Sequence, residues 1–217
     1  PDVAVGTGLV IEVFGFAGGI YAYASRRLID YRLGLSLLVV TVPVAIAGSW
    51  LSGMADPRLL KAVLGAGLFA VATSFLKGPE EKDLHRMDEA IRKEYGGEKA
   101  ETCLTASSGE RICYTVCNRT EGRILAGTGA LFLGMISTGL GELNGYFLLQ
   151  RCRVPSRISV ATSVFVIAVT ALFASGGHVA RFLKGGGQDF SSVVELIVFA
   201  VPGVLLGAQL GPLVASR

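Results

Sequence analysis

The segment that decides the fold reads Gly139-Leu140-Gly141-Glu142-Leu143-Asn144-Gly145. It overlaps the end of an uncharged run, Ile124–Gly141, whose composition is that of a membrane-spanning helix. A carboxylate and a carboxamide therefore stand among glycines, before the chain reaches the basic residues Arg151 and Arg153. Glycines let a backbone unwind, and unwound backbone at membrane depth occurs only where it is buried in protein or lines a cavity. The pattern predicts a polar site at a broken helix.

The composition of the whole chain is that of a membrane protein. Of its 217 residues 51% are hydrophobic and 29 are glycine, and the mean hydropathy is +0.56; such values exclude an ordinary soluble domain. The net charge is only +3, and basic residues do not alternate with aromatic ones, so we expect no nucleic-acid partner. The four cysteines are too few and too scattered to predict a disulfide framework: Cys103, Cys113, Cys117 and Cys152.

Six apolar segments predict six membrane helices, so the expected fold is an all-α polytopic membrane protein with a Gly-broken helix near residues 139–145. Each segment is close to the roughly 20 residues that a membrane-spanning helix needs. The segments are residues 3–24, 33–55, 57–76, 124–149, 158–180 and 193–215.

One polar stretch, residues 77–122, separates the third predicted span from the fourth. Mixed charges with apolar residues at helical spacing predict a short amphipathic helix at 80–93, and a β-hairpin follows around Gly109. If all six segments cross the membrane, this loop lies on the same side as Arg26 and Arg27, and Arg151 and Arg153 lie on the opposite side. We expect the loop to be cytoplasmic, with unpaired thiols. The spacing of Cys103, Cys113 and Cys117 matches no standard zinc pattern, so we expect no metal site, although a site shared with His85 is the alternative.

The chain repeats itself at an offset of about 155–159 residues. Asp30 matches Asp189, Pro43 matches Pro202, Gly48 matches Gly207 and Leu51 matches Leu210. One repeat length contains four predicted helices, an even number, so the two copies point the same way if every segment spans; a break within the membrane leaves inverted halves open. We expect two repeats of four helices, at residues 1–76 and 123–217, with the first and last helices lying outside this sequence.

Several of these stretches occur in a fixed order. Residues 139–145 are followed by Val154-Pro155 and then by Val160-Ala161-Thr162-Ser163, while the first half has Ala4-Val5-Gly6-Thr7-Gly8-Leu9 and then residues 26–31. This order resembles the TauE/SafE family of membrane transporters, the sulfite exporters. Glu142 and Asn144 stand where the usual family motif has glycine.

The resemblance implies a transporter, not an enzyme, that needs no cofactor and exports a small anion such as sulfite or an organosulfonate across the cytoplasmic membrane, with proton coupling. The alternative is an integral membrane subunit that keeps the transporter fold but packs into a larger complex; a homodimer is equally compatible. A cavity beside Glu142 favours the transporter, and a buried hydrogen-bonded contact there favours the subunit.

Two glutamates are the candidates for proton coupling. Glu142, at membrane depth, either exchanges a proton or holds the broken backbone together. Glu12, in the middle of the first predicted span, is either a second proton site or pairs with a neighbouring helix. Asn144 either orients the substrate or satisfies backbone groups. Gly141, directly before Glu142, is the last candidate in this segment.

The remaining candidates come from two predicted helix starts. Thr162 and Ser163 follow Pro155, and Thr7 and Gly8 follow Pro1. Helix N-termini offer unpaired amides and a partial positive charge, which suit an anion. Ordinary helix packing by small residues is the alternative.

Overall fold

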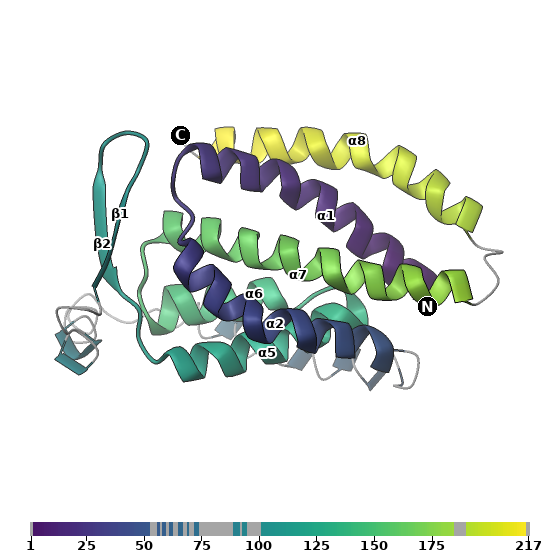
Figure 1. Cartoon of the computed structure of the whole chain (residues 1–217), viewed down its shortest axis with the longest axis horizontal. Helices are drawn as coiled ribbons and strands as arrows, with labels where there is room; N and C mark the ends of the chain where they lie inside the picture. The colour runs from purple at the N-terminus through teal and green to yellow at the C-terminus, as the bar shows by residue number, and fades with distance from the viewer. Residues whose placement is uncertain are drawn as a thin grey trace.

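The computed structural model describes residues 2–52, 101–184 and 190–215, together with scattered residues between 56 and 94. The described chain is mostly helical, with one small β-hairpin (Figure 1). Most of the predicted third span, residues 57–76, and most of the predicted amphipathic helix at 80–93 lie outside the described residues.

Four long helices form most of the structure: α1 (Asp2–Ser25), α2 (Tyr31–Leu51), α7 (Ser156–Lys184) and α8 (Phe190–Ala215). Three stretches of the described chain, Thr7–Ser25, Tyr31–Leu51 and Ser156–Ala180, are long and apolar enough to cross a membrane. Large apolar side chains lie on the outer surface, for example Phe199 at 82% exposure. These features fit an all-α membrane protein whose outer surface contacts lipid.

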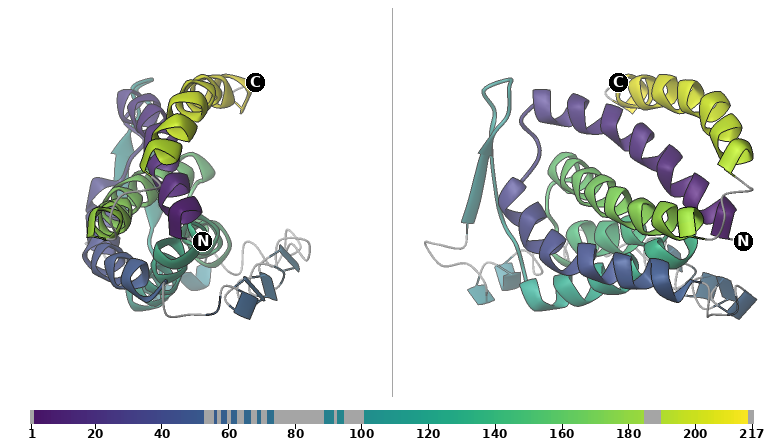
Figure 2. Two further views of the ribbon diagram at one scale, coloured as in Figure 1. Left: turned by 90° about the vertical axis from the view of Figure 1, so that its right-hand side faces the viewer. Right: turned by 45° about the vertical axis from the view of Figure 1, so that its right-hand side comes forward.

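The helices lie side by side in the order α8, α1, α7, α2, α5 (Figures 1 and 2), where α5 is Arg119–Ile136. Buried hydroxyls of Thr41 and Thr170 form a hydrogen bond of 2.9 Å between α2 and α7. Between α2 and α5 the backbones nearly touch, because a Cβ at Gly48 would lie 2.6 Å from the Leu131 carbonyl oxygen. Small residues permit this close approach, as is common between membrane helices.

The segment after α5 folds back instead of continuing the helix. After α5 come α6 (Leu140–Gly145) and the π-helix η1 (Tyr146–Arg151). Three contacts pair the outgoing and returning arms in antiparallel order: Gly129 with Leu140, Gly122 with Phe147, and Cys117 with Cys152. We call α5, α6 and η1 together the helical hairpin.

The reversal corrects the prediction that residues 124–149, with a glycine break near 139–145, form one membrane span. The helix ends at Ser137 (φ 61°) and turns at Gly139 (φ 111°), both in the left-handed region. The break lies at the start of the predicted range 139–145, and it sends the chain back to the end from which it came. Gly139 is suited to this turn because it has no Cβ to clash at positive φ.

The reversal also bears on the direction of the repeats, for which the sequence leaves parallel copies and inverted halves open. α1 and α8 run toward the β-hairpin end of the molecule, whereas α2 and α7 run away from it (Figure 1). In sequence α1 matches α7 and α2 matches α8, so matched helices run in opposite directions. The prediction of parallel copies counted residues 124–149 as a full crossing. For the same reason Arg151 and Arg157 lie at the end that also carries Arg26, not at the opposite one.

A two-stranded antiparallel hairpin covers this end, with β1 at Glu101–Thr105 and β2 at Arg111–Thr115. It is fixed to the α1–α2 connection by a 2.6 Å hydrogen bond in which the Tyr114 hydroxyl donates to Asp30 Oδ2. The other carboxylate oxygen of Asp30 accepts from the Leu33 amide at 3.0 Å and caps α2. Burial, and then the Asp30 hydrogen bond, raise the pKa of the Tyr114 hydroxyl above its ordinary value.

All four cysteines are paired, contrary to the expectation of unpaired thiols: Cys103 with Cys113 and Cys117 with Cys152. The strand register places Cys103 directly opposite Cys113, and the helical hairpin brings Cys152 back to Cys117. Spacing along the sequence cannot reveal the second pair, because it depends on the reversal.

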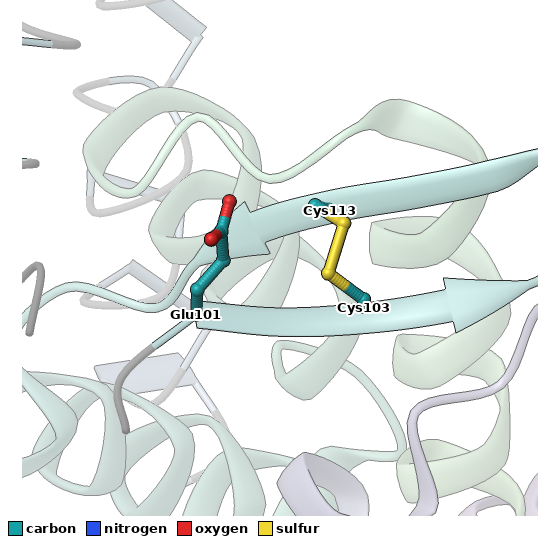
Figure 3. A group of neighbouring side chains, drawn as sticks. All are labelled: Glu101, Cys103 and Cys113. Carbon is teal, nitrogen blue, oxygen red and sulfur yellow. A yellow bond between two sulfur atoms is a disulfide. The ribbon is translucent and has the colours of Figure 1, made fainter. Parts of the chain in front are cut away.

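Glu101 lies beside the Cys103–Cys113 disulfide (Figure 3). Metal binding by cysteine needs a thiolate, and both sulfurs here are joined to each other. In this oxidised form the three residues do not make a metal site.

Candidate functional site

A cavity of about 360 Å³ lies where α1, the reversal, α6 and α7 meet. It is open on one side and is lined by both polar and apolar side chains. The lining residues are Glu12, Phe16, Leu133, Thr138, Gly139, Gly141, Glu142 and Ile167.

Glu12 reaches the cavity from α1. The Ser137 hydroxyl donates to Glu12 Oε2 at 3.4 Å and so connects α1 to the reversal. One turn before Glu12 on the same helix, a Cβ at Gly8 would lie 3.4 Å from Ser137 Oγ. Gly8 therefore leaves room for the reversal beside α1.

Glu142 reaches the cavity from the first turn of α6. The Gly139 amide donates to Glu142 Oε2 at 3.1 Å, and the Thr138 hydroxyl donates to Oε1 at 3.3 Å. This is the carboxylate half of a capping box, which satisfies an amide that the broken helix leaves unpaired. The same side chain is exposed toward the cavity. Glu142 thus holds the reversal together and also faces a space that a small molecule can enter.

The two carboxylates give the cavity its electrostatic character. None of the described lining residues is Lys, Arg or His, and the walls from α5 and α7 are the apolar Leu133 and Ile167. Two negative charges in one cavity repel each other. Such an arrangement is suited to binding protons or a cation.

Asn144 and Ser163 form a second polar feature at the α6–α7 contact. Asn144 is 1% exposed and Ser163 is 7% exposed, and the side-chain polar atoms of both lack a hydrogen-bond partner among the described residues. A Cβ at Gly141 would lie 3.1 Å from Ile167. Buried polar groups without partners are costly, and a bound ligand would satisfy them.

Comparison with known proteins decides the family. The family model described as "Sulfite exporter TauE/SafE" matches residues 1–217. The chain belongs to this sulfite exporter family. It is also similar to the "Probable membrane transporter protein YunE" of Bacillus subtilis (strain 168), with 22% identity over 214 residues, 97% of this chain and 71% of that protein. No solved structure matches it. The chain is accordingly a multi-pass membrane transporter, as the resemblance of its motifs to TauE/SafE proteins predicts.

Within this TauE/SafE protein the predicted site residues fall into two groups. Glu12, Glu142 and Gly141 line the cavity, and Gly8 lies next to it. Thr7, Asn144, Thr162 and Ser163 are buried outside the lining.

Thr162 and Ser163 do not lie at a helix N-terminus. α7 begins at Ser156, which places Thr162 at the end of its second turn and Ser163 at the start of its third. The Thr162 hydroxyl accepts a 3.0 Å hydrogen bond from the Asp30 amide and so fixes the α1–α2 connection to α7.

Three polar residues were missed by the sequence reasoning. Ser137 and Thr138 contact the two cavity carboxylates, and their position directly before Gly139 in an uncharged run is a usable signal. His178 is 1% exposed inside α7, with Nε2 2.9 Å from the Gly134 carbonyl oxygen. A lone histidine between small residues gives no signal of such burial.

Proposed function

We propose that this protein moves a small anion, such as sulfite or an organosulfonate, outward across the cytoplasmic membrane, and that Glu142 and Glu12 couple this movement to protons. The observation that carries the proposal is that both carboxylates line one cavity at the reversal of a broken helix. Substrate and coupling-ion sites of transporters are typically built at such discontinuous helices. A cavity beside Glu142 also favours a transporter over a purely structural subunit.

The coupling follows from charge repulsion. An anion entering the cavity meets Glu142 and Glu12, with no Lys or Arg among the described lining residues to offset them. Protonation of the carboxylates removes this repulsion, so proton binding and anion binding favour each other. An inside-negative membrane potential then favours outward movement of any net negative charge.

The other predicted site residues have supporting roles in this proposal. Asn144 and Ser163 supply the buried hydrogen-bonding groups at the α6–α7 contact, and Gly141 permits the approach of α7. Thr162, Thr7 and Gly8 hold α1 and α7 in position around the cavity. Because the described lining residues include no cationic side chain, an anion would be bound through hydrogen bonds.

We propose that the β-hairpin end faces the cytoplasm. Eight arginines flank the helices at that end, namely Arg26, Arg27, Arg32, Arg119, Arg123, Arg151, Arg153 and Arg157. Among the described residues, four basic ones belong to the opposite end, namely Arg58, Lys61, Arg181 and Lys184. Basic residues near helix ends are retained on the cytoplasmic side. The two disulfides favour an oxidising compartment, but the arginine distribution governs membrane insertion, which precedes disulfide formation.

The test is sulfite flux in proteoliposomes containing the full protein, with and without an imposed pH gradient. Glu142→Gln and Glu12→Gln preserve the size of the side chain but cannot exchange a proton. We expect both variants to lose the dependence of flux on the pH gradient. Glu195→Gln, which changes an exposed carboxylate on α8 away from the cavity, is the matched control and should retain it.

Two outcomes would argue against the proposal. Gradient-dependent flux that survives both cavity substitutions would remove the coupling role of the carboxylates. Absence of flux for sulfite and for organosulfonates, with a partner protein co-purifying in stoichiometric amount, would favour the structural subunit.

A further inference from the structure

We propose that the Cys117–Cys152 disulfide is a redox-controlled latch that positions the cavity carboxylate Glu142, an inference that rests on the proposed transport function. Reduction of the latch would alter substrate binding. Cys117 and Cys152 would thus be positioning residues that act through the helical hairpin.

The latch lies at one end of the helical hairpin and the cavity at the other. Cys117 directly precedes the cap residue of α5, and Cys152 directly follows η1, with a Cα–Cα distance of 5.1 Å. The reversal at Ser137–Gly139 joins the same two arms at the cavity. The disulfide therefore closes a ring of residues that contains Glu142, and it fixes the register of one arm against the other.

The two arms are held by different neighbours. α5 is packed against α2 through backbone contacts, with a Cβ at Gly48 only 2.6 Å from the Leu131 carbonyl oxygen. The returning arm is packed against α5, and its Leu140 and Phe147 are 0% and 1% exposed. Because α5 is fixed to α2, a change in the register of the helical hairpin moves the returning arm, which carries Glu142.

The π-helix supplies the means of the shift. η1 ends in the hydrogen bond from the Cys152 amide to the Phe147 carbonyl oxygen, 2.9 Å and five residues apart. π-helices are rare, are often found at functional sites, and accommodate one extra residue per turn relative to an α-helix. With Cys152 bonded to Cys117 the end of η1 is fixed. When that bond opens, η1 can relax toward α-helical geometry, which would rotate and shift α6 with Glu142.

The redox step is an ordinary thiol–disulfide exchange. A dithiol reductant gives two electrons and two protons to the disulfide, leaves Cys117 and Cys152 as thiols, and itself becomes a disulfide. Cys117 is 6% and Cys152 3% exposed, whereas Cys103 and Cys113 are both exposed. A disulfide at a cytoplasm-facing end is most often a redox-sensing one.

The experiment isolates the latch by using Cys103→Ser/Cys113→Ser as the starting protein, which leaves Cys117–Cys152 as its sole disulfide. Sulfite flux is measured in proteoliposomes at a series of sulfite concentrations and pH values, before and after treatment with membrane-permeant dithiothreitol. We expect reduction to raise the KM several-fold and to displace the pH profile, because Glu142 moves. Reoxidation should restore both.

Cys117→Ser/Cys152→Ser is the companion variant. It should behave like the reduced protein and should not respond to dithiothreitol. A disulfide that merely adds stability would lower the melting temperature on reduction and leave KM and the pH profile unchanged, and that result would overturn the proposal.

Hydrogen exchange separates failure of the latch from failure of the transport function. Amides of residues 140–152 are compared between the oxidised and reduced starting protein. Faster exchange confined to these residues supports the latch even if no flux is found for any anion, a result that would count against the proposed function alone. Unchanged exchange, or a uniform increase over all helices, contradicts the latch.

Discussion

At the scale of single residues, Asp30 and Tyr114 connect elements that the sequence keeps 84 positions apart. One carboxylate oxygen of Asp30 caps α2 and the other accepts the Tyr114 hydroxyl. The cap can be predicted, because Asp30 directly precedes an apolar helical run. The partner cannot, because nothing local to Tyr114 indicates which surface the β-hairpin will cover.

Tyr114→Phe should therefore loosen the β-hairpin without altering its shape. A hydrogen bond to a charged group contributes about 1.5–3 kcal/mol, and we expect a loss of that order in the free energy of unfolding, measured by denaturation in detergent. Tyr21→Phe is the control, because Tyr21 is 75% exposed on α1. An equal effect of the two substitutions would show that the hydrogen bond to Asp30 contributes nothing.

The same contact has a definite pH dependence. The pKa of Tyr114 is raised in the folded protein, so its contribution to stability is complete below the ordinary tyrosine pKa of about 10. It is lost as the pH rises from that value toward the folded-state pKa. The stability difference between the wild type and Tyr114→Phe should accordingly be constant near neutral pH and shrink in strongly alkaline solution.

Glu142 shows at the same scale what composition can and cannot predict. A carboxylate in an apolar run predicts a functional or structural contact within the membrane, and Glu142 has features of both. That Glu12 shares its cavity is not predictable from either segment, because it depends on how α1 packs against the reversal.

At the scale of elements, the helical hairpin depends on glycines of α5 that face the returning arm. The sequence predicts that a helix breaks near residue 139, because glycines and polar residues gather there. It does not predict that the chain reverses. A reversal needs a returning arm that fits, and the fit lies in the contacts of Gly122 with Phe147 and of Gly129 with Leu140.

Gly129→Ala tests this fit. Its Cβ would lie 2.8 Å from the Leu140 backbone and 3.0 Å from the Gly139 carbonyl oxygen, at the reversal itself. Because backbone cannot rotate away as a side chain can, we expect a loss of about 1–3 kcal/mol and reduced sulfite flux. Both are measured on the same purified protein, by unfolding in detergent and by flux in proteoliposomes.

Gly145→Ala is the matched control on the returning arm. Gly145 has helical dihedral angles (φ −59°, ψ −48°), and a Cβ there would meet nothing within 4 Å among the described residues. Alanine should be neutral or slightly stabilising at such a position. If the two alanines behave alike, close packing of the arms does not position the cavity.

At the scale of the whole molecule, the reversal decides how the two halves are related. Repeat matches such as Pro43 with Pro202 identify α2 and α8 as corresponding helices, but their relative direction depends on the number of crossings between them. That number falls by one when residues 124–149 enter and leave the membrane on the same side. Sequence periodicity measures helix length and cannot distinguish a crossing from a return.

Because residues 124–149 return instead of crossing the membrane, Arg151, Arg153 and Arg157 lie at the β-hairpin end. Their position strengthens the prediction that this end is cytoplasmic. Ser108→Cys, in the exposed turn of the β-hairpin, and Arg58→Cys, shortly after α2, place a single thiol near each end. The native cysteines are paired in the structure, and the unsubstituted protein, treated in the same way, measures any labelling of native thiols. We expect a membrane-impermeant maleimide to label Arg58→Cys in intact cells, and Ser108→Cys only in inside-out vesicles.

The labelling pattern also determines what the disulfides can do. On the cytoplasmic side, cellular dithiols are present and reduce Cys117–Cys152, at 6% and 3% exposure, only when this end of the helical hairpin opens. The latch then responds to the redox state of the cell. If Ser108→Cys is labelled in intact cells instead, the β-hairpin lies in an oxidising compartment. Cys117–Cys152 would then be a permanent link that fixes the position of Glu142, and the arginine distribution would have failed as a guide to orientation.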